Sequence, residues 1–271
     1  MVQRFLVDAM GVKHSRAESK PRIISLVPSI TELLFALGVG PYVVGRTRFC
    51  VHPRASVARI PCVGGTKDLD HYRLRVLAPT HVIMNIDENR KVDAEALAAW
   101  VPNLIITHPV QPEDNLRLYW LLGGIFGKFE EARHLCTAFR RAHQRIAKAA
   151  EKLPSQRVLY VIWSSPWITV SKSTYISRML SLVRWETIAD DPQCRYPTVV
   201  ISEELLAESQ LILFSTEPYP FQQRHIDAFR DQFFLRGHRL ALIDGELLSW
   251  YGSRAIGGLN YLRAFATAQF V

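Results

Sequence analysis

The sequence predicts an α/β protein of two lobes, each with a parallel sheet, joined by a single long helix. Three observations in its 271 residues predict this fold. Short runs of β-branched and apolar residues alternate with helical stretches in the first half, which is typical of parallel sheets covered by helices. A stretch without helix-breaking residues covers 129–153, and the alternation resumes after Pro154. We therefore expect lobes at 21–128 and 154–271, preceded by a polar tail at 1–20.

The first lobe is expected to contain four strands, each a short apolar run that ends at Pro, Gly or polar residues. They are Arg22–Val27, Tyr42–Gly45, His81–Asn85 and Asn103–Thr107. Pro28 breaks the first strand, and Ser29 or Thr31 is expected to cap the helix that follows and ends at Gly38. The other helices expected here are Leu69–Leu77, Val92–Trp100 and Leu116–Phe126.

The stretch 129–153 is predicted to be one long helix that links the lobes. Its apolar residues recur at helical spacing, and Lys and Arg occupy the other faces. At ~1.5 Å per residue such a helix spans roughly 35–40 Å. The apolar positions are Phe129, Ala132, Cys136, Phe139, Ala142, Ile146, Ala149 and Leu153.

The second lobe repeats the β–α alternation without a sequence repeat of the first lobe. Its expected strands are Arg157–Trp163, Leu211–Ser215 and Leu240–Ile243. Its expected helices are Tyr175–Val183, Ser202–Glu208, Phe221–Phe229 and Asn260–Phe270.

The N-terminus lacks the features of a secretory signal, which needs a basic start and an apolar stretch of about 7–15 residues. Here Asp8 interrupts the first apolar run after Val7. As written, the sequence predicts a cytoplasmic protein unless the true start lies upstream. No apolar run reaches the ~18 residues of a membrane-spanning helix, so we expect a protein that does not itself span a membrane.

Composition argues against a nucleic-acid-binding protein. The formal charge is +8, but the Lys and Arg residues are scattered, and neither zinc-finger spacing nor an RNA-recognition signature occurs. We therefore expect a positively charged, solvated surface. The four cysteines are far apart and form no CxxC pair. A disulfide between Cys50 and Cys62 stays open, because spacing alone does not fix connectivity.

The sequence also lacks the motifs of common enzyme classes. It contains no GxSxG, GxxxxGK[ST] or HExxH, which excludes the usual serine hydrolases, P-loop enzymes and zinc proteases. Glu203 and Glu204 are adjacent on an expected helix and point in different directions, so they do not form a carboxylate pair. We therefore predict a protein that is not an enzyme.

Candidate binding residues of the first lobe follow the ends of its strands. Ligands of parallel α/β sheets bind beyond the carboxyl ends of the strands, and three loops meet this criterion. Their candidate residues are Phe49, His52, Thr66, Lys67 and Glu88. Cys50 and His52 are residue types that bind zinc or iron, although two ligands make an incomplete site.

The second lobe contributes mainly aromatic candidates. They lie beside Pro, Gly and Ser in loops, where a role in the core is less natural. A flat aromatic surface on two lobes suits a large planar ligand held in the cleft between them. These candidates are Trp163, Trp167, Tyr196, Tyr219, Trp250, Tyr251 and Arg254. Lys67 and Arg254 are expected to meet phosphate or carboxylate groups of that ligand.

A family resemblance extends over about Pro21 to Val271. The segment RIISLVPSITELLFALG (Arg22–Gly38) resembles the opening of the helical-backbone, class III substrate-binding proteins of ABC importers, in particular the cobalamin and metal-chelate receptors. The resemblance continues, in the same order, through VVGRTRFCVHP, VGGTKDLD, IDENRKVDAEAL, IWSSPWITVSKSTYISRML, RYPTV, STEPYPF and DGELLSWYGSR.

The resemblance implies two Rossmann-like lobes joined by a backbone helix. It implies a monomer, usually periplasmic, that captures cobalamin or a related corrinoid or metal chelate in the interlobe cleft for ABC import. No cofactor is required, and the bound species would be a corrinoid, a ferric chelate or a metal ion. Phe49 then looks like the aromatic that packs on the corrin, and Trp167 or Ile168, Tyr196 and Trp250 look like the second-lobe wall. As a histidine, His52 is expected to reach the metal of such a ligand as an axial ligand.

The sequence also departs from the family pattern. Thr66 and Lys67 stand where cobalamin receptors can carry a Trp. Family members dock on their permease through one Glu per lobe; Glu204 fits that place in the second lobe, whereas Tyr72 occupies it in the first. The alternatives are bare zinc or iron bound by Cys50, His52 and Glu88, a ferric siderophore or haem, and a non-exported relative that has lost transport.

Overall fold

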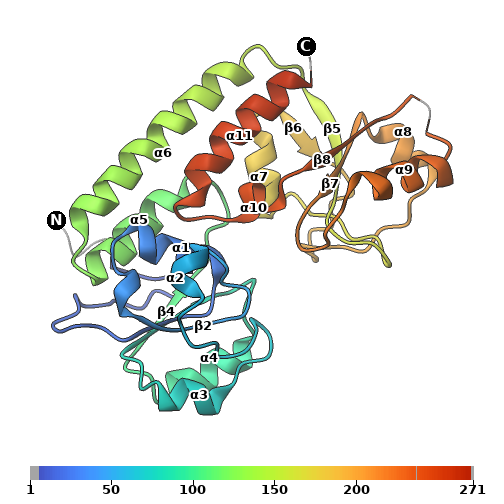
Figure 1. Ribbon diagram of the computed structural model, residues 1–271. Helices are drawn as coiled ribbons and strands as arrows, with labels where there is room; N and C mark the ends of the chain where they lie inside the picture. Colours follow the sequence, from blue (N-terminus) through green and yellow to red (C-terminus); the bar gives the residue numbers. More distant parts are fainter. Residues whose placement is uncertain (1–5, 236, 270–271) are drawn as a thin grey trace. The chain divides into compact units, whose positions relative to one another are not determined.

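The computed structural model describes residues 6–235 and 237–269, which form two compact units. The first unit consists of 6–109, 113–139 and 251–254, and the second of 110–112, 140–250 and 255–269. Each unit is built on a four-stranded parallel sheet with helices around it (Figure 1). The predicted α/β fold with two parallel sheets is therefore confirmed.

The first sheet has the strand order β2-β1-β3-β4. Its strands are β1 (Ile23–Ser25), β2 (Val43–Arg46), β3 (His81–Asn85) and β4 (Asn103–Thr107). Its helices are α1 (Pro28–Ala36), α2 (Arg54–Val57), α3 (His71–Val76), α4 (Lys91–Ala98) and α5 (Asp114–Ile125), with a 3-10 turn η2 (Gly40–Tyr42). All five residues of β3 are buried, as expected of a central parallel strand with both faces covered.

Helix α1 begins earlier than its expected caps. Pro28 occupies the first turn, where its missing N–H leaves no hydrogen bond unmade. The Thr31 hydroxyl donates to the Val27 carbonyl at 3.0 Å, and Val27 is the N-cap without a side-chain bond. The prediction that Ser29 or Thr31 caps this helix is therefore wrong, because proline starts the helix first.

Residues 6–17 do not form the expected polar tail; residues 1–5 lie outside the described part of the chain. The side chain of Leu6 is buried, and so is Asp8 at 2% exposure. The Ala9 amide donates to the Ile106 carbonyl at 2.9 Å, and the Ile106 amide donates to the Asp8 carboxylate at 3.1 Å. The segment thus covers the outer edge of β4, where an open strand edge would invite pairing with other chains. The prediction relied on the polar composition of this segment. In the structure the Asp8 carboxylate accepts the hydrogen bond from the Ile106 amide that a carbonyl of a neighbouring strand would otherwise accept.

The second sheet has the strand order β6-β5-β7-β8. Its strands are β5 (Gln156–Val161), β6 (Trp185–Thr187), β7 (Leu211–Ser215) and β8 (Arg239–Ile243). Its helices are α7 (Tyr175–Ser181), α8 (Glu203–Glu208), α9 (Gln223–Gln232), α10 (Gly245–Ser249) and α11 (Arg254–Ala268). The expected end of the last helix, Phe270, lies outside the described residues. Phe214, Phe221 and Phe229 pack together in one core of this unit.

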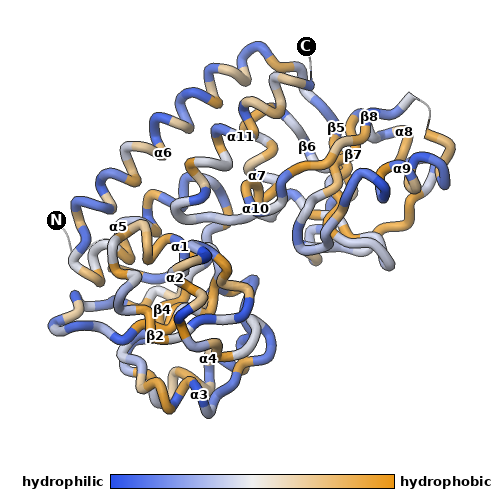
Figure 2. Tube along the Cα trace, viewed as in Figure 1, coloured by the Kyte–Doolittle hydropathy of each residue, from blue (hydrophilic) through white to orange (hydrophobic). Residues whose placement is uncertain are grey.

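The long helix α6 (Phe129–Ala150) is confirmed and ends slightly before the expected Leu153. Its residues up to Phe139 belong to the first unit and those from Arg140 to the second. Ala132, Cys136, Phe139 and other apolar positions are buried, and Figure 2 shows hydrophilic residues recurring along the length of the helix. The described residues contain no helix long and apolar enough to cross a membrane.

Candidate functional site

In the first unit, exposed apolar side chains follow the carboxyl ends of strands β2 and β3. Phe49 comes after β2 and is 50% exposed, and Ile86 comes after β3 and is 44% exposed. The Arg48 guanidinium lies 5.7 Å from the centre of the Phe49 ring. Large exposed apolar side chains at this edge of a parallel sheet lie where ligands of such sheets bind.

Hydrogen bonds tie the loops at this edge together. Lys67 Nζ donates to the Asp87 carbonyl at 3.0 Å. Asn89, which lies in a candidate loop but is not among the expected ligand residues, donates from Nδ2 to the carbonyls of Leu26 at 3.2 Å and Thr66 at 3.1 Å. The Thr66–Lys67 loop and the loop after β3 are therefore held side by side. The sequence signal for this role is the spacing of the two asparagines, since Asn89 follows Asn85 by four residues. The backbone N–H of Asn85 donates to Asn89 Oδ1 at 2.9 Å.

Glu88 is held by Tyr251 rather than left open to solvent. The phenol of Tyr251 donates to Glu88 Oε1 at 2.7 Å. Tyr251 is only 6% exposed, and burial together with the neighbouring carboxylate raises its pKa well above the ordinary value, so it stays a donor. Tyr251 therefore positions Glu88 within the first unit, and its contact with a ligand stays a prediction.

Arg254 also has a partner inside the first unit. Its Nε and Nη2 atoms donate to the two carboxylate oxygens of Glu32 at 2.7 and 2.9 Å. A bidentate pair of this kind is specific and strong. The charge of Arg254 is thus matched by Glu32 in this structure, and its expected role toward ligand acids stays a prediction.

The surroundings of Cys50 disfavour metal binding. Cys50 is fully buried, and its Sγ lies 3.2 Å from Thr47 Oγ1 and 3.8 Å from the Ser25 carbonyl oxygen. Burial raises the pKa of the Cys50 thiol and so disfavours the thiolate that binds metals. Across residues 6–235 and 237–269, no three or more His, Cys, Asp and Glu residues are grouped as a metal site. Cys50 and Cys62 are both free thiols.

In the second unit, exposed aromatic side chains gather beyond β5 and β7. Trp163 is 39% exposed and meets Tyr219 edge to face, with ring centres 5.5 Å apart. Tyr196 is 41% exposed, and backbone pairing of Thr198 with Ile168 holds its loop beside the loop that follows β5. The structure therefore keeps Trp163, Tyr196 and Tyr219 as accessible candidates.

Trp167 and Trp250 have mainly structural surroundings. Trp167 stacks on Phe221 with an interplanar angle of 7° and meets Phe229 edge to face at 5.2 Å. Trp250 is 6% exposed, and its Nε1 donates to Glu217 Oε2 at 3.0 Å. Trp167 is only partly buried, so its contact with a ligand stays a prediction, as does that of Trp250, of which little surface is exposed.

The two proposed permease-docking positions differ in chemistry. Glu204 lies in the first turn of α8 and is exposed. A hydrogen bond with Ser202 is the main cause that lowers the pKa of Glu204, so this side chain is a carboxylate at neutral pH. Tyr72 on α3 is 77% exposed. The first unit thus presents a phenol where the second presents a charge.

Comparison with known proteins agrees with the fold. The family model described as "Periplasmic binding protein" matches residues 23–241. A "Vitamin B12-binding protein" of Pectobacterium carotovorum subsp. carotovorum (strain PC1) is 24% identical over 222 residues, 80% of each chain. One of Yersinia pestis (strain Pestoides F) is 23% identical over 199 residues, 73% of this chain and 71% of the relative.

Solved structures show the same architecture. The periplasmic vitamin B12 binding protein BtuF of Vibrio cholerae has a TM-score of 0.78 at 19% identity, over 93% of this chain and 98% of BtuF. The periplasmic heme-binding protein RhuT from Roseiflexus sp. RS-1 has a TM-score of 0.77 at 20% identity, over 92% and 99%. The family model covers residues 23–241, which is most of the chain. The chain therefore belongs to the periplasmic binding protein family.

Proposed function

We propose that this protein captures a metal-centred tetrapyrrole, with cobalamin as the first candidate and haem as the second, for ABC-type import. The observation that carries the proposal is the set of exposed aromatic side chains beyond the carboxyl ends of the strands in each unit. Phe49 belongs to the first unit, and Trp163 and Tyr196 belong to the second. Burying such rings against a large apolar ligand is favourable at about 25 cal/mol per Å² of apolar surface.

The charges beside these rings fit an amphipathic ligand. Lys67 is exposed, and its Nζ donates to the Asp87 carbonyl. Arg48 lies beside Phe49 and already pairs with the carboxylate of Asp68. Lys67 is therefore the cation that we assign to the acid groups of the two candidates, the phosphate of cobalamin and the propionates of haem. The curated relatives named for vitamin B12 support cobalamin, and the heme-binding neighbours support haem.

The test is a titration of the purified protein with cyanocobalamin and, separately, with iron protoporphyrin. We expect saturable quenching of tryptophan fluorescence by one ligand per chain. The ligand's absorption spectrum after release should be that of the starting material, as expected of binding without turnover. If neither compound binds saturably, the proposal is wrong.

Matched variants locate the binding surface. Phe49→Ala and Trp163→Ala are each expected to weaken binding by about tenfold or more, since central aromatic contacts carry most of the energy of such surfaces. The controls are Tyr72→Ala in the first unit and Phe234→Ala in the second, because both aromatics are more than 70% exposed and follow no strand. Equal losses in variants and controls would contradict the assignment.

We propose further that Glu204 is the contact with an ABC permease in the second unit, and that Tyr72 takes this place in the first. The exposed carboxylate of Glu204 fits a basic partner surface. In proteoliposomes with a cobalamin-type permease, Glu204→Lys should weaken docking and leave ligand affinity unchanged. Glu203→Lys is the charge-matched control, because Glu203 is exposed on the same helix and points in a different direction from Glu204. Docking that survives Glu204→Lys would rule out this contact.

A further inference from the structure

The part of helix α6 that belongs to the second unit carries a row of exposed cations. Arg141, Arg145 and Lys148 follow one another at spacings of four and three residues, so they lie on one face of the helix. Lys152 follows Lys148 by four residues, in the turn just after the helix. All four residues are exposed, and we call them the basic row.

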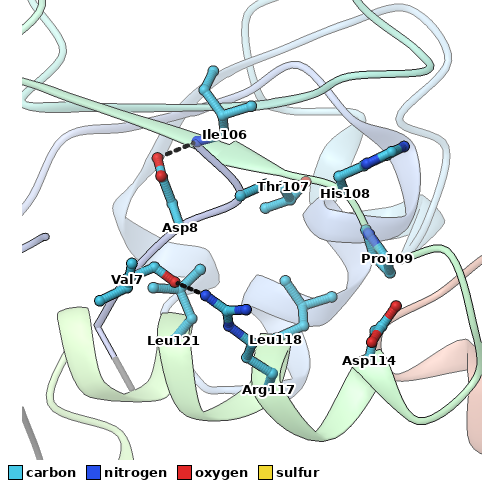
Figure 3. Close-up of a pocket in the computed structure, with 11 residues that line it drawn as sticks. Val7, Asp8, Ile106, Thr107, His108, Pro109, Asp114, Arg117, Leu118 and Leu121 are labelled. Carbon is cyan, nitrogen blue, oxygen red and sulfur yellow. Dashed lines mark hydrogen bonds between the residues drawn. The ribbon is translucent and has the colours of Figure 1, made fainter. Parts of the chain in front are cut away.

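Several cations of the first unit, by contrast, are bound within the fold. The Arg117 guanidinium donates to the Val7 carbonyl at 3.0 Å beside a small cavity (Figure 3). Near the start of α6, Arg133 pairs with Glu130 on the preceding turn. The charge of α6 is therefore balanced locally in the first unit.

No acidic residue balances the basic row in this way. The sequence of α6 contains no Asp or Glu between Glu131 and Glu151, and none of the four cations forms an ion pair with any of the described residues. Arg145 Nε donates to the Arg141 carbonyl at 3.3 Å. A guanidinium has five N–H donors, so most of those of Arg145 remain for an anionic partner.

The stability of the helix does not account for the row. Like charges four residues apart on a helix destabilise it, which applies to Arg141 and Arg145. Cations stabilise the C-terminal end of a helix, but only within its last turn. Lys148 lies in that turn, whereas Arg141 and Arg145 lie more than one turn before the end at Ala150. An anionic partner outside the protein would offset the repulsion between them.

The surroundings of the row fit a lipid surface better than a single-stranded nucleic acid. Its exposed neighbours on the second-unit part of α6 are Arg140, Gln144 and Ala147, so the row has no aromatic ring on which bases could stack. Clusters of Lys and Arg are attracted to anionic bilayers. Lipid headgroups also move laterally within a bilayer, so they can adjust to the spacing of the cations.

We infer that the basic row binds the surface of a bilayer that contains anionic phospholipid. The apolar side of this part of α6 is buried in the protein, as Ala142 and Ile146 show. The helix therefore lies on the headgroups without inserting, and the attraction is electrostatic and screened by salt. The basic row contains none of the candidate ligand residues, and the inference does not depend on the proposed tetrapyrrole.

The test is co-sedimentation of the full-length protein with lipid vesicles. Vesicles of phosphatidylcholine with about 30% phosphatidylglycerol should bind the protein at low ionic strength, whereas vesicles of phosphatidylcholine alone should not. Raising the ionic strength to about 0.5 M should release the protein, because salt screens charges over a few ångströms at such concentrations.

Two double variants locate the contact on the basic row. Arg141→Gln combined with Arg145→Gln should weaken binding to the mixed vesicles by about tenfold or more, since each cation near such a surface contributes about fivefold. Lys148→Gln combined with Lys152→Gln should have a similar effect. Glutamine is a good helix former, so all these chains should fold, and circular dichroism checks that they do.

The matched control is Arg224→Gln combined with Arg230→Gln. It removes the same amount of charge from exposed positions of α9 in the same unit. Its binding to the mixed vesicles should stay within about twofold of the unmodified protein, because these cations lie outside the basic row.

Three results would overturn the inference. They are equal binding to both kinds of vesicle, unchanged binding of both double variants of the basic row, and an equal loss in the control, which would assign the attraction to net charge. A fourth result would assign the basic row to nucleic acid instead, namely binding of a short DNA duplex at an ionic strength that releases the vesicles.

Discussion

At the residue scale, the hydrogen bond between Tyr251 and Glu88 joins two segments of the first unit, 251–254 and the loop after β3. Tyr251→Phe removes the donor and keeps the ring, so Glu88 loses its buried partner. Hydrogen bonds to charged groups contribute about 1.5–3 kcal/mol, and we expect the free energy of unfolding to fall by that amount in urea titrations. Tyr72→Phe, at an exposed phenol, should leave it unchanged. Equal stabilities of Tyr251→Phe and the unmodified protein would show that the bond contributes nothing.

His81 makes stability depend on pH. It is 5% exposed, and burial, with a smaller contribution from the charge of His14, lowers its pKa to about 4. The unfolded chain binds this proton near pH ~6.5, so below that pH the unfolded state takes up a proton that the folded state refuses. The contribution of His81 to the free energy of unfolding is fully present above pH ~6.5. It is lost as the pH falls toward ~4, by up to about 3 kcal/mol.

The measurement is the urea midpoint at several pH values between neutral and the lower pKa. His81→Gln should flatten this dependence, whereas His134→Gln, at an exposed position on α6, should not. Hydrogen bonds from His14 and backbone amides outweigh burial and lower the pKa of Asp8. The contribution of Asp8 to the free energy of unfolding therefore changes only below the usual aspartate pKa, outside this pH range. An unchanged slope in His81→Gln would assign the pH dependence to other groups.

Residue-level roles were the hardest to predict from the sequence. Tyr251, Arg254 and Trp250 stand beside Gly and Ser in one loop, which suggested accessible ligand contacts. Their partners are Glu88, 163 positions away, and Glu32, 222 positions away, together with Glu217. Pairings over such separations depend on the assembled fold, and a local pattern does not contain them. Phe49 and Trp163 were expected at or just beyond the ends of strands and Tyr196 in a loop, and all three side chains are exposed.

At the element scale, longer sequence patterns predicted strands and helices more accurately than shorter ones. The strands β3, β4 and β7 have the predicted bounds, because five-residue apolar runs between polar residues are unambiguous. Strand β6 and helix α10 were missed, since three and five residues are too few to show a period. Helix α11 starts well before the expected Asn260, because Gly257 and Gly258 read as helix breakers.

The two glycines of α11 have different reasons to be glycine. A Cβ on Gly258 would lie 2.1 Å from the Leu247 carbonyl oxygen, whereas a Cβ on Gly257 would be 3.5 Å from Leu247 Cδ2, an ordinary contact. Gly257→Ala should therefore stabilise the protein by about 0.5–1 kcal/mol through helix propensity. Gly258→Ala should destabilise it by about 1–3 kcal/mol through overpacking. Thermal unfolding of the two variants tests this, and shifts of the same sign would contradict it.

At the scale of the whole molecule, the fold was predictable because every level of the sequence agreed. Turn residues, apolar runs and the uninterrupted stretch of α6 all indicated the same β–α order, which is what specifies a single structure. The N-terminal segment was the exception. Its few apolar residues gave no periodic signal, and its attachment depends on the buried carboxylate of Asp8 at the edge of β4.

The net charge of +8 allows the two ligand candidates to be separated by salt. Electrostatic attraction raises association rates and is screened over about 10 Å at 0.1 M ionic strength. Iron protoporphyrin carries two propionates, whereas cyanocobalamin has no net charge. In stopped-flow fluorescence, the association rate of iron protoporphyrin should fall several-fold from low to high salt, and that of cyanocobalamin should change little. Lys67→Gln should reduce the salt dependence for iron protoporphyrin, with Lys91→Gln, an exposed lysine of α4, as control. Equal salt dependence for both ligands would show that the charge of the protein does not discriminate between them.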